Sequence, residues 1–123
     1  MVNYFMVIKG SLVDLNKYIE AERTNRFMGA EIKSQETEFI YHEAKKQKLE
    51  PIKKYPITVQ IDFYCENRRK DPDNIAFTKK YILDGLVRAK ILKNDGFKQI
   101  KGFIDNFYLD KENPRIEVFL CNG

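Results

Sequence analysis

Two periods of hydrophobic and polar residues alternate along the chain and divide it into predicted strands and helices. A period of two in "ITVQIDFYC", residues 57–65, and in "RIEVFLC", residues 115–121, is typical of β-strands. "NYFMVIKG", residues 3–10, predicts a first strand that ends at Gly10, and residues 98–110 are a further strand candidate. In the strand of residues 57–65, one face would carry Ile57, Val59, Ile61 and Phe63.

Spacings of three, four and seven between apolar residues predict the helices. They run through residues 12–48, where Asn25 and Gly29 mark either a break between two helices or a bend. They return in residues 74–92, directly after a charged stretch. Prolines bound the intervening linker, residues 50–56.

The resulting order is strand, helix (one or two), strand, helix, strand, strand. This order favours the α+β class, with a single small mixed β-sheet of about four strands covered by helices. A length of 123 residues and 43% hydrophobic residues predict one domain, residues 1–123, with its own core. We find no second domain, repeat or low-complexity segment.

Composition adds expectations about the compartment. No run approaches the roughly 18 apolar residues of a membrane span, and the N-terminus lacks the features of a signal peptide. We therefore expect no membrane partner and a cytoplasmic location. The two cysteines, Cys65 and Cys121, lie in strand-like segments and are expected to be reduced and buried.

The positive charge is concentrated in one third of the chain. Residues 68–101 hold 10 of the 22 lysines and arginines but only 4 of the 18 acidic residues. Such a patch indicates a partner that carries phosphate, although a solvated face without a partner has the same composition.

Two carboxylates interrupt this basic segment in "RRKDPDN", residues 68–74. Pro72 favours an extended Asp71, and in an extended segment Asp71 and Asp73 would point to the same side. Paired carboxylates suit a hard cation such as Mg²⁺ or Mn²⁺. The alternative is an ordinary surface turn in which Asp73 caps the following helix.

Three further charged residues share one face of that predicted helix. At 100° per residue, Lys80, Asp84 and Arg88 lie near the direction of Asp73, opposite an apolar face. That apolar face comprises Ile75, Ile82, Leu86 and Ala89. A lysine beside a phosphodiester would stabilise negative charge in a transition state, whereas an ordinary solvated stripe is the alternative.

Asp95 follows in the turn "KNDGFKQ", residues 93–99, and would complete a three-carboxylate cluster with Asp71 and Asp73 if the next strand returns beside the strand that precedes them. The alternative is that Asp95 and Gly96 form an ordinary turn. With a single histidine, zinc and acyl-transfer chemistry are disfavoured, and no phosphate-binding glycine loop is present. Most aromatic residues are in phase with core faces, and Phe77 alone is a candidate for base stacking.

Taken together, "RRKDPDN", "KKYILDGL" and "KNDG" resemble the RusA family of Holliday junction endonucleases of bacteria and their phages. "DLNKYIEAERTNR" near the start and "NPRIEVFL" at the end extend the resemblance over nearly the whole chain. The chain departs from the RusA family pattern in two places. Three extra residues lie between Asn74 and Lys80, and Asn94 stands where many members have aspartate.

The resemblance implies a role for each matching residue. Asp71, Asp73 and Asp95 would bind Mg²⁺, with Mn²⁺ as a substitute, and Lys80 would be catalytic. Asn74, Asp84 and Asn94 are supporting positions. The residues expected to contact DNA phosphates are Arg68, Arg69, Lys70, Arg88, Lys90 and Lys93.

The function implied is Mg²⁺-dependent resolution of Holliday junctions by paired symmetric cleavage, during DNA recombination and repair. Two symmetric nicks require a homodimer on the four-way junction. The expected location is the cytoplasm of a bacterial cell, and the resemblance is compatible with a chain that a phage encodes. The alternatives are a branched-DNA-binding protein that does not cleave and a structural protein whose surface is merely basic.

Overall fold

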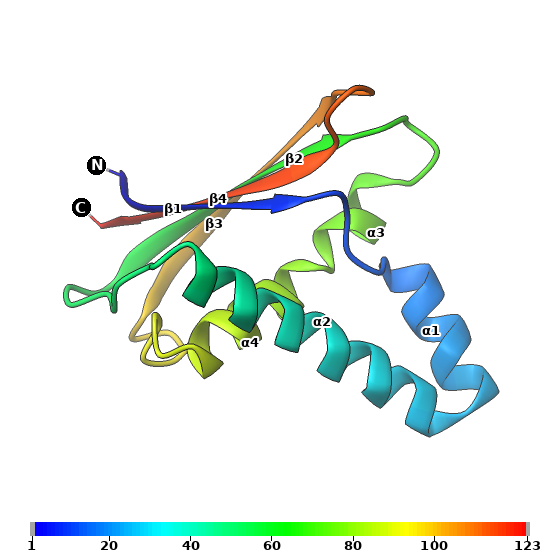
Figure 1. The fold of residues 1–123 in the computed structure, drawn as a ribbon, viewed down its shortest axis with the longest axis horizontal. Coiled ribbons are helices and arrows are strands. Elements are labelled where there is room, and N and C mark those ends of the chain that lie inside the picture. Colours follow the sequence, from blue (N-terminus) through cyan, green and yellow to red (C-terminus); the bar gives the residue numbers. More distant parts are fainter. Residues whose placement is uncertain (1, 123) are drawn as a thin grey trace.

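A computed structural model of the chain describes residues 2–122 and has one β-sheet with all helices on the same face (Figure 1). The strands are β1 (Val2–Lys9), β2 (Ile57–Cys65), β3 (Ile100–Leu109) and β4 (Arg115–Asn122). The helices are α1 (Leu15–Thr24), α2 (Arg26–Lys46), α3 (Pro72–Ala76) and α4 (Lys79–Arg88). The predicted α+β class and the predicted order of elements are confirmed.

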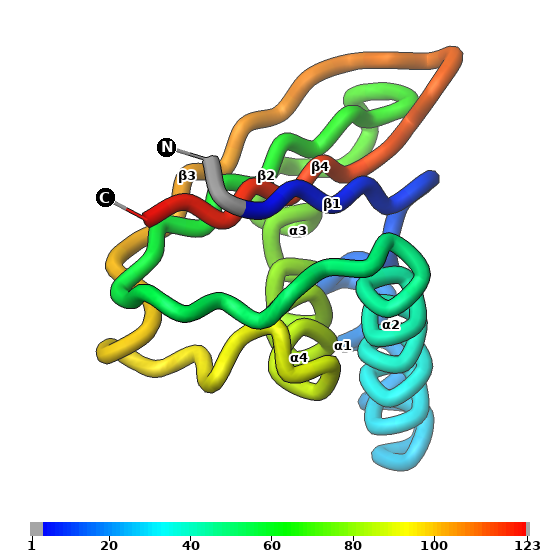
Figure 2. The backbone as a smooth tube through the Cα atoms, turned by 60° about the vertical axis from the view of Figure 1, so that its left-hand side comes forward, coloured from blue at the N-terminus to red at the C-terminus, as the bar shows by residue number. Residues whose placement is uncertain are grey.

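The sheet is mixed, and its strands follow the order β1-β4-β2-β3. Antiparallel pairs join β1 to β4 and β4 to β2, whereas β2 and β3 run parallel. The parallel pair requires the crossover through α3 and α4, which explains why the chain leaves the sheet after Cys65. Figure 2 shows this crossover below the sheet, with α4 beside α2.

Alternate residues of the strands form the core against the helices. The predicted face of β2 is confirmed, because Ile57, Val59, Ile61 and Phe63 are all buried. α4 contributes Tyr81, Ile82 and Leu86, each fully buried. The other sheet face has no helix over it in the described part of the chain (Figure 1).

Asn25 decides between the break and the bend that the sequence left open. It has an extended backbone, and its side chain accepts a hydrogen bond from the backbone N–H of Phe27 at 2.8 Å. An N-cap of this kind starts a new helix, so residues 12–48 contain two helices. Asp14 caps the first in the same way, through the N–H of Lys17.

The predicted helix over residues 74–92 is wrong in its continuity and in both ends. Pro72, whose missing N–H costs nothing at the first helical position, starts α3 two residues earlier. A tight turn then interrupts the helix, where the hydroxyl of Thr78 donates to the carbonyl of Ile75. Lys90, in the left-handed conformation at φ 62°, ends α4 before Leu92.

Gly85 lies where α4 packs tightly against α2. A Cβ at this position would lie 2.4 Å from Cβ of Ile40 and 3.0 Å from the carbonyl oxygen of Thr37. We expect Gly85→Ala to lower the free energy of unfolding by about 1–3 kcal/mol, because overpacking outweighs the helix propensity of alanine. Urea unfolding followed by circular dichroism measures the change.

Gly96→Ala is the matched control, because its added methyl group would meet only a side-chain oxygen of Gln99 at 3.5 Å. It is expected to leave stability within about 0.5 kcal/mol of wild type. A Gly85→Ala protein as stable as wild type would contradict the tight contact between the two helices.

Neither cysteine forms a disulfide, and both are partly exposed rather than buried as expected. Burial is nevertheless sufficient to raise the pKa of the Cys65 thiol above its ordinary value. In residues 2–122, no helix combines the length and apolar character needed to cross a membrane.

Candidate functional site

Lys80 is the centre of the candidate site, and it lies in the first turn of α4. Its Nζ is 3.1 Å from Oδ1 of Asp84 and 3.8 Å from Oδ2 of Asp95. The first contact follows from the i,i+4 spacing on one helix face, as the sequence predicts. The second joins the helix to the loop after it, whereas the three-carboxylate hypothesis requires Asp95 to approach Asp71 and Asp73.

The loop that carries Asp95 is held by local hydrogen bonds. The side chain of Asn94 accepts from the backbone N–H of Asp95 at 2.9 Å, and that of Gln99 accepts from the N–H of Gly96. The hydroxyl of Tyr55 accepts from the N–H of Lys93 and fixes the start of the loop. Asn94 therefore positions Asp95, and an aspartate there would accept the same bond.

The ammonium of Lys80 is stabilised in its charged form. The hydrogen bond to Asp84 raises the pKa of Lys80 above its ordinary value, the nearby charges of both aspartates add to this, and partial burial opposes it less strongly. Asp84 also contacts Lys33 of α2, with 3.9 Å between Nζ and Oδ2. Lys80 is thus a fixed positive charge at neutral pH and not a proton acceptor.

Asp71 and Asp73 lie at the other end of the crossover and do not form the predicted extended pair. Asp71 is the extended residue, with φ −71° and ψ 151°, and it holds the N-cap position without a side-chain hydrogen bond. Asp73 is already helical, and its Oδ1 accepts from the N–H of Asn74. The hypothesis that Asp73 caps the helix is also wrong, because Pro72 shifts the helix start by two residues.

A Mg²⁺ site would need these carboxylates together. Their chemistry fits, because Asp71 and Asp73 are exposed oxygen donors with no ion-pair partner among the described contacts. Their arrangement does not fit a Mg²⁺ site, because no group of three histidine, cysteine, aspartate or glutamate side chains suited to a metal occurs within residues 2–122. Asp95 instead contacts the ammonium of Lys80.

Two residues near the predicted site are structural. Asn74 is buried, and its Oδ1 accepts from the backbone N–H of Asn16, which ties α3 to α1. Lys70, predicted to bind DNA, contacts the buried Asp14 at 2.7 Å. Burial alone would raise the pKa of Asp14, but the hydrogen bonds and charges of Lys70 and Lys17 outweigh it and lower the pKa.

The remaining predicted DNA contacts divide into free and engaged cations. Arg68, Arg69, Lys90 and Lys93 are exposed, and none of their side chains forms an ion pair within residues 2–122. Arg88 pairs with Glu38 and stacks over the ring of Tyr41 at 4.8 Å, so it binds α2. The free cations flank the candidate site on both sides in sequence.

Phe97 is an exposed aromatic residue that the sequence pattern did not single out. Its side chain is fully exposed in the loop just after Asp95. Phe77, the predicted base-stacking residue, instead packs against Tyr18 and Tyr81 at 5.3 and 5.6 Å between ring centroids. The sequence could have indicated that Phe97 is exposed, because an aromatic residue between Gly96 and Lys98 belongs to no apolar face.

Lys79, the neighbour of Lys80, has a separate role that was also missed. Its Nζ lies 2.7 Å from Oδ2 of Asp105 and 4.2 Å from the ring centroid of Phe103, both on β3. Adjacent lysines on α4 thus point to different partners, one to the sheet and one to the loop of Asp95.

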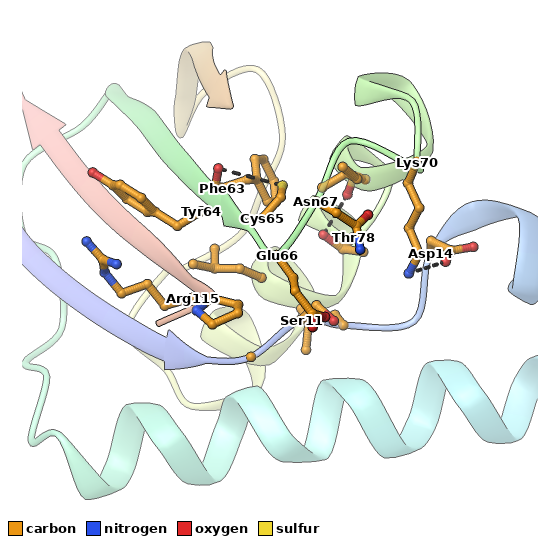
Figure 3. A pocket seen from close by; sticks show the side chains of 15 residues that line it. Ser11, Asp14, Phe63, Tyr64, Cys65, Glu66, Asn67, Lys70, Thr78 and Arg115 are labelled. Carbon is orange, nitrogen blue, oxygen red and sulfur yellow. Dashed lines mark hydrogen bonds and ion pairs between the residues drawn. The ribbon is translucent and has the colours of Figure 1, made fainter. Parts of the chain in front are cut away.

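A pocket of about 240 Å³ lies between the start of α1 and the end of β2, next to α3 (Figure 3). Phe63, Ile75 and Ile116 supply apolar walls, and the pair of Lys70 and Asp14 lies at one side. It is smaller than most small-molecule sites.

Comparison with protein-family models and with curated protein sequences finds no match to this chain.

Proposed function

We propose that this protein is a Mg²⁺-dependent, structure-selective DNA endonuclease that resolves four-way junctions, as its resemblance to the RusA family implies. The observation that carries the proposal is the convergence of Lys80, Asp84 and Asp95 within an otherwise basic segment. The ammonium of Lys80 lies between a carboxylate on its own helix and one on a separate loop. This arrangement supports a functional site over an ordinary solvent-exposed helix face, because the contact with the loop does not stabilise the helix.

Each residue has a definite task in this proposal. Asp71, Asp73 and Asp95 would hold Mg²⁺ only if junction binding brings them together, and the ion would then supply Lewis-acid polarisation of a phosphodiester and activation of water. Lys80, charged at neutral pH, would offset negative charge that develops on the phosphate. Asn94 would orient Asp95.

Binding would come from the free cations around the site, Arg68, Arg69, Lys90 and Lys93. Contacts of this kind release counterions, so affinity should fall steeply as salt concentration rises. Lys70 and Arg88 would contribute less, because each already has an acidic partner.

A second candidate is a branched-DNA-binding protein that does not cleave. The arrangement of the carboxylates favours it, since Asp71 and Asp73 do not form a cluster with Asp95 among the described residues. Both candidates predict tight junction binding, and only the endonuclease predicts nicks.

Cleavage of a synthetic four-way junction tests the proposal, with Mg²⁺ in one arm and EDTA in the other. The endonuclease is expected to place symmetric, Mg²⁺-dependent nicks in two opposing strands. Tight binding without nicks would establish the second candidate. Equal affinity for a junction and for a duplex of the same length would rule out both.

Phe97→Ala is expected to weaken junction binding by about 10- to 100-fold, because stacking of a base on an aromatic ring contributes roughly 1–3 kcal/mol. The expectation rests on the full exposure of Phe97 beside Asp95. Electrophoretic mobility shifts in EDTA measure it. Phe27→Ala is the control, because Phe27 is also exposed but lies in the first turn of α2. Equal losses in both variants would exclude stacking specific to Phe97.

A further inference from the structure

The pocket between the start of α1 and the end of β2 has no task in the proposed function. Its lining comes from four segments: the connection from β1 to α1, the end of β2 with the connection that follows, the region of α3, and the start of β4 (Figure 3). These segments are separated in the sequence, so the pocket is a feature of the tertiary structure and not of a single loop.

The inner wall of the pocket is apolar. Leu12, Phe63 and Ile116 line it and are at most 5% exposed, so they also belong to the core. The volume of about 240 Å³ exceeds the roughly 150 Å³ of an apolar cavity that takes up benzene. The pocket therefore has room for one aromatic ring with a small substituent.

The two cations that line the pocket already have acidic partners. Nζ of Lys70 lies 2.7 Å from Oδ2 of the buried Asp14. The guanidinium of Arg115 contacts the carboxylates of Asp110 and Glu117, each at 2.8 Å. An anionic ligand would have to compete with these carboxylates for either cation, so the lining does not favour a carboxylate or a phosphate.

Glu66 differs from the other charged residues of the lining. It is exposed, and its carboxylate forms no hydrogen bond or ion pair with any other residue in the described part of the chain. An unpaired carboxylate attracts a positive charge, whereas the apolar wall behind it favours a hydrophobic group. The two features together suit a ligand that buries a ring and leaves a cationic end near solvent.

We propose that this pocket binds a small organic cation, a single aromatic ring that carries an amidinium or ammonium group. The ring would pack against Phe63 and Ile116. A planar amidinium would donate two parallel hydrogen bonds to the carboxylate of Glu66, as the guanidinium of arginine does to carboxylates. This inference goes beyond the proposed function and does not depend on it.

The pocket is separate from the Lys80 site but borders the segment that leads to Asp71. Glu66 and Lys70 line the pocket, and Asp71 directly follows Lys70. Lys80 and Asp95 are not part of the lining. Binding in the pocket is therefore measured without DNA or metal, and its outcome is independent of whether the protein cleaves junctions.

Three probes of nearly the same shape test the charge preference: benzamidine, which is cationic, benzamide, which is neutral, and benzoate, which is anionic. Titrations followed by amide chemical shifts measure their affinities for wild type. Benzamidine is expected to bind about tenfold more tightly than benzamide, and benzoate more weakly than either. Equal affinities, a preference for benzoate, or no binding of benzamidine up to about 10 mM would overturn the proposal.

Glu66→Gln removes the unpaired charge and keeps the size of the side chain. It is expected to weaken benzamidine binding about 5- to 10-fold and to leave benzamide affinity within about twofold of wild type. Glu50→Gln is the matched control, because Glu50 is also exposed but lies outside the pocket. It is expected to bind all three probes as wild type does. Equal losses in the two variants would mean that benzamidine responds to overall charge, which would overturn the role of Glu66.

The two cysteines report where the probe binds. Both thiols are free and partly exposed, but Cys65 lines the pocket and Cys121 does not. Benzamidine at ten times its dissociation constant is expected to slow alkylation of Cys65 by iodoacetamide about tenfold and to leave Cys121 unchanged. Mass spectrometry of the two peptides measures both rates. Equal protection of both cysteines, or none of Cys65 by bound benzamidine, would place the ligand elsewhere and overturn the proposal.

Discussion

Replacing Lys80 by alanine is expected to slow junction cleavage about 100- to 1,000-fold while changing junction affinity less than about threefold. The reason is that its ammonium, placed between Asp84 and Asp95, would interact with charge present mainly in the transition state. Single-turnover cleavage and mobility shifts on the same junction measure the two quantities. Equal losses in both would make Lys80 a phosphate contact.

Lys33→Ala is the matched control for this variant. Lys33 and Lys80 are about equally exposed and both contact Asp84, but Lys33 has no contact with Asp95. Loss of either exposed ion pair is expected to cost at most about 1 kcal/mol of stability. A difference in cleavage between the two variants would therefore report the position of Lys80 and not the loss of a positive charge near α4.

Local patterns predicted the elements well, because their causes lie within a few residues. The alternation in residues 57–65 depends on which side chains face the core, and the buried side chains of Ile57, Val59 and Ile61 confirm it. The contact between Lys80 and Asp84 follows likewise from helix geometry.

Errors arose where a local signal competed with a second one. Pro72 starts the helix earlier than predicted and the turn at Thr78 interrupts it, and the periodicity of apolar residues detects neither. The extended pair of Asp71 and Asp73 failed for the same reason, because a helix that starts at Pro72 includes Asp73.

Contacts between distant segments were beyond the sequence pattern. The pair of Lys79 and Asp105 exists only because β3 lies parallel to β2 and faces α4. The hydrogen bonds between the side chain of Gln47 and the backbone of Val7 likewise depend on where α2 ends relative to β1. The approach of Asp95 to Lys80 was not predicted, because it depends on how the loop after α4 folds back.

If the proposed function holds, Asp73→Asn and Asp95→Asn are each expected to reduce cleavage at least about 1,000-fold, because loss of a carboxylate proposed to hold Mg²⁺ would remove several kcal/mol of transition-state stabilisation. Junction binding in EDTA is expected to be unchanged or tighter, since each change removes a negative charge near DNA phosphates. Cleavage in Mg²⁺ and mobility shifts in EDTA measure the two effects.

Asp110→Asn is the control for charge, because Asp110 pairs with Arg115 at the turn between β3 and β4 and has no contact with Lys80. It is expected to cleave at the wild-type rate. The pair of variants also separates the two carboxylate positions. Loss of cleavage in Asp95→Asn alone would confine the site to Lys80 and the loop after α4, and would remove Asp73 from it. Loss in both would mean that these carboxylates, apart in the described arrangement, act together once DNA and Mg²⁺ are bound.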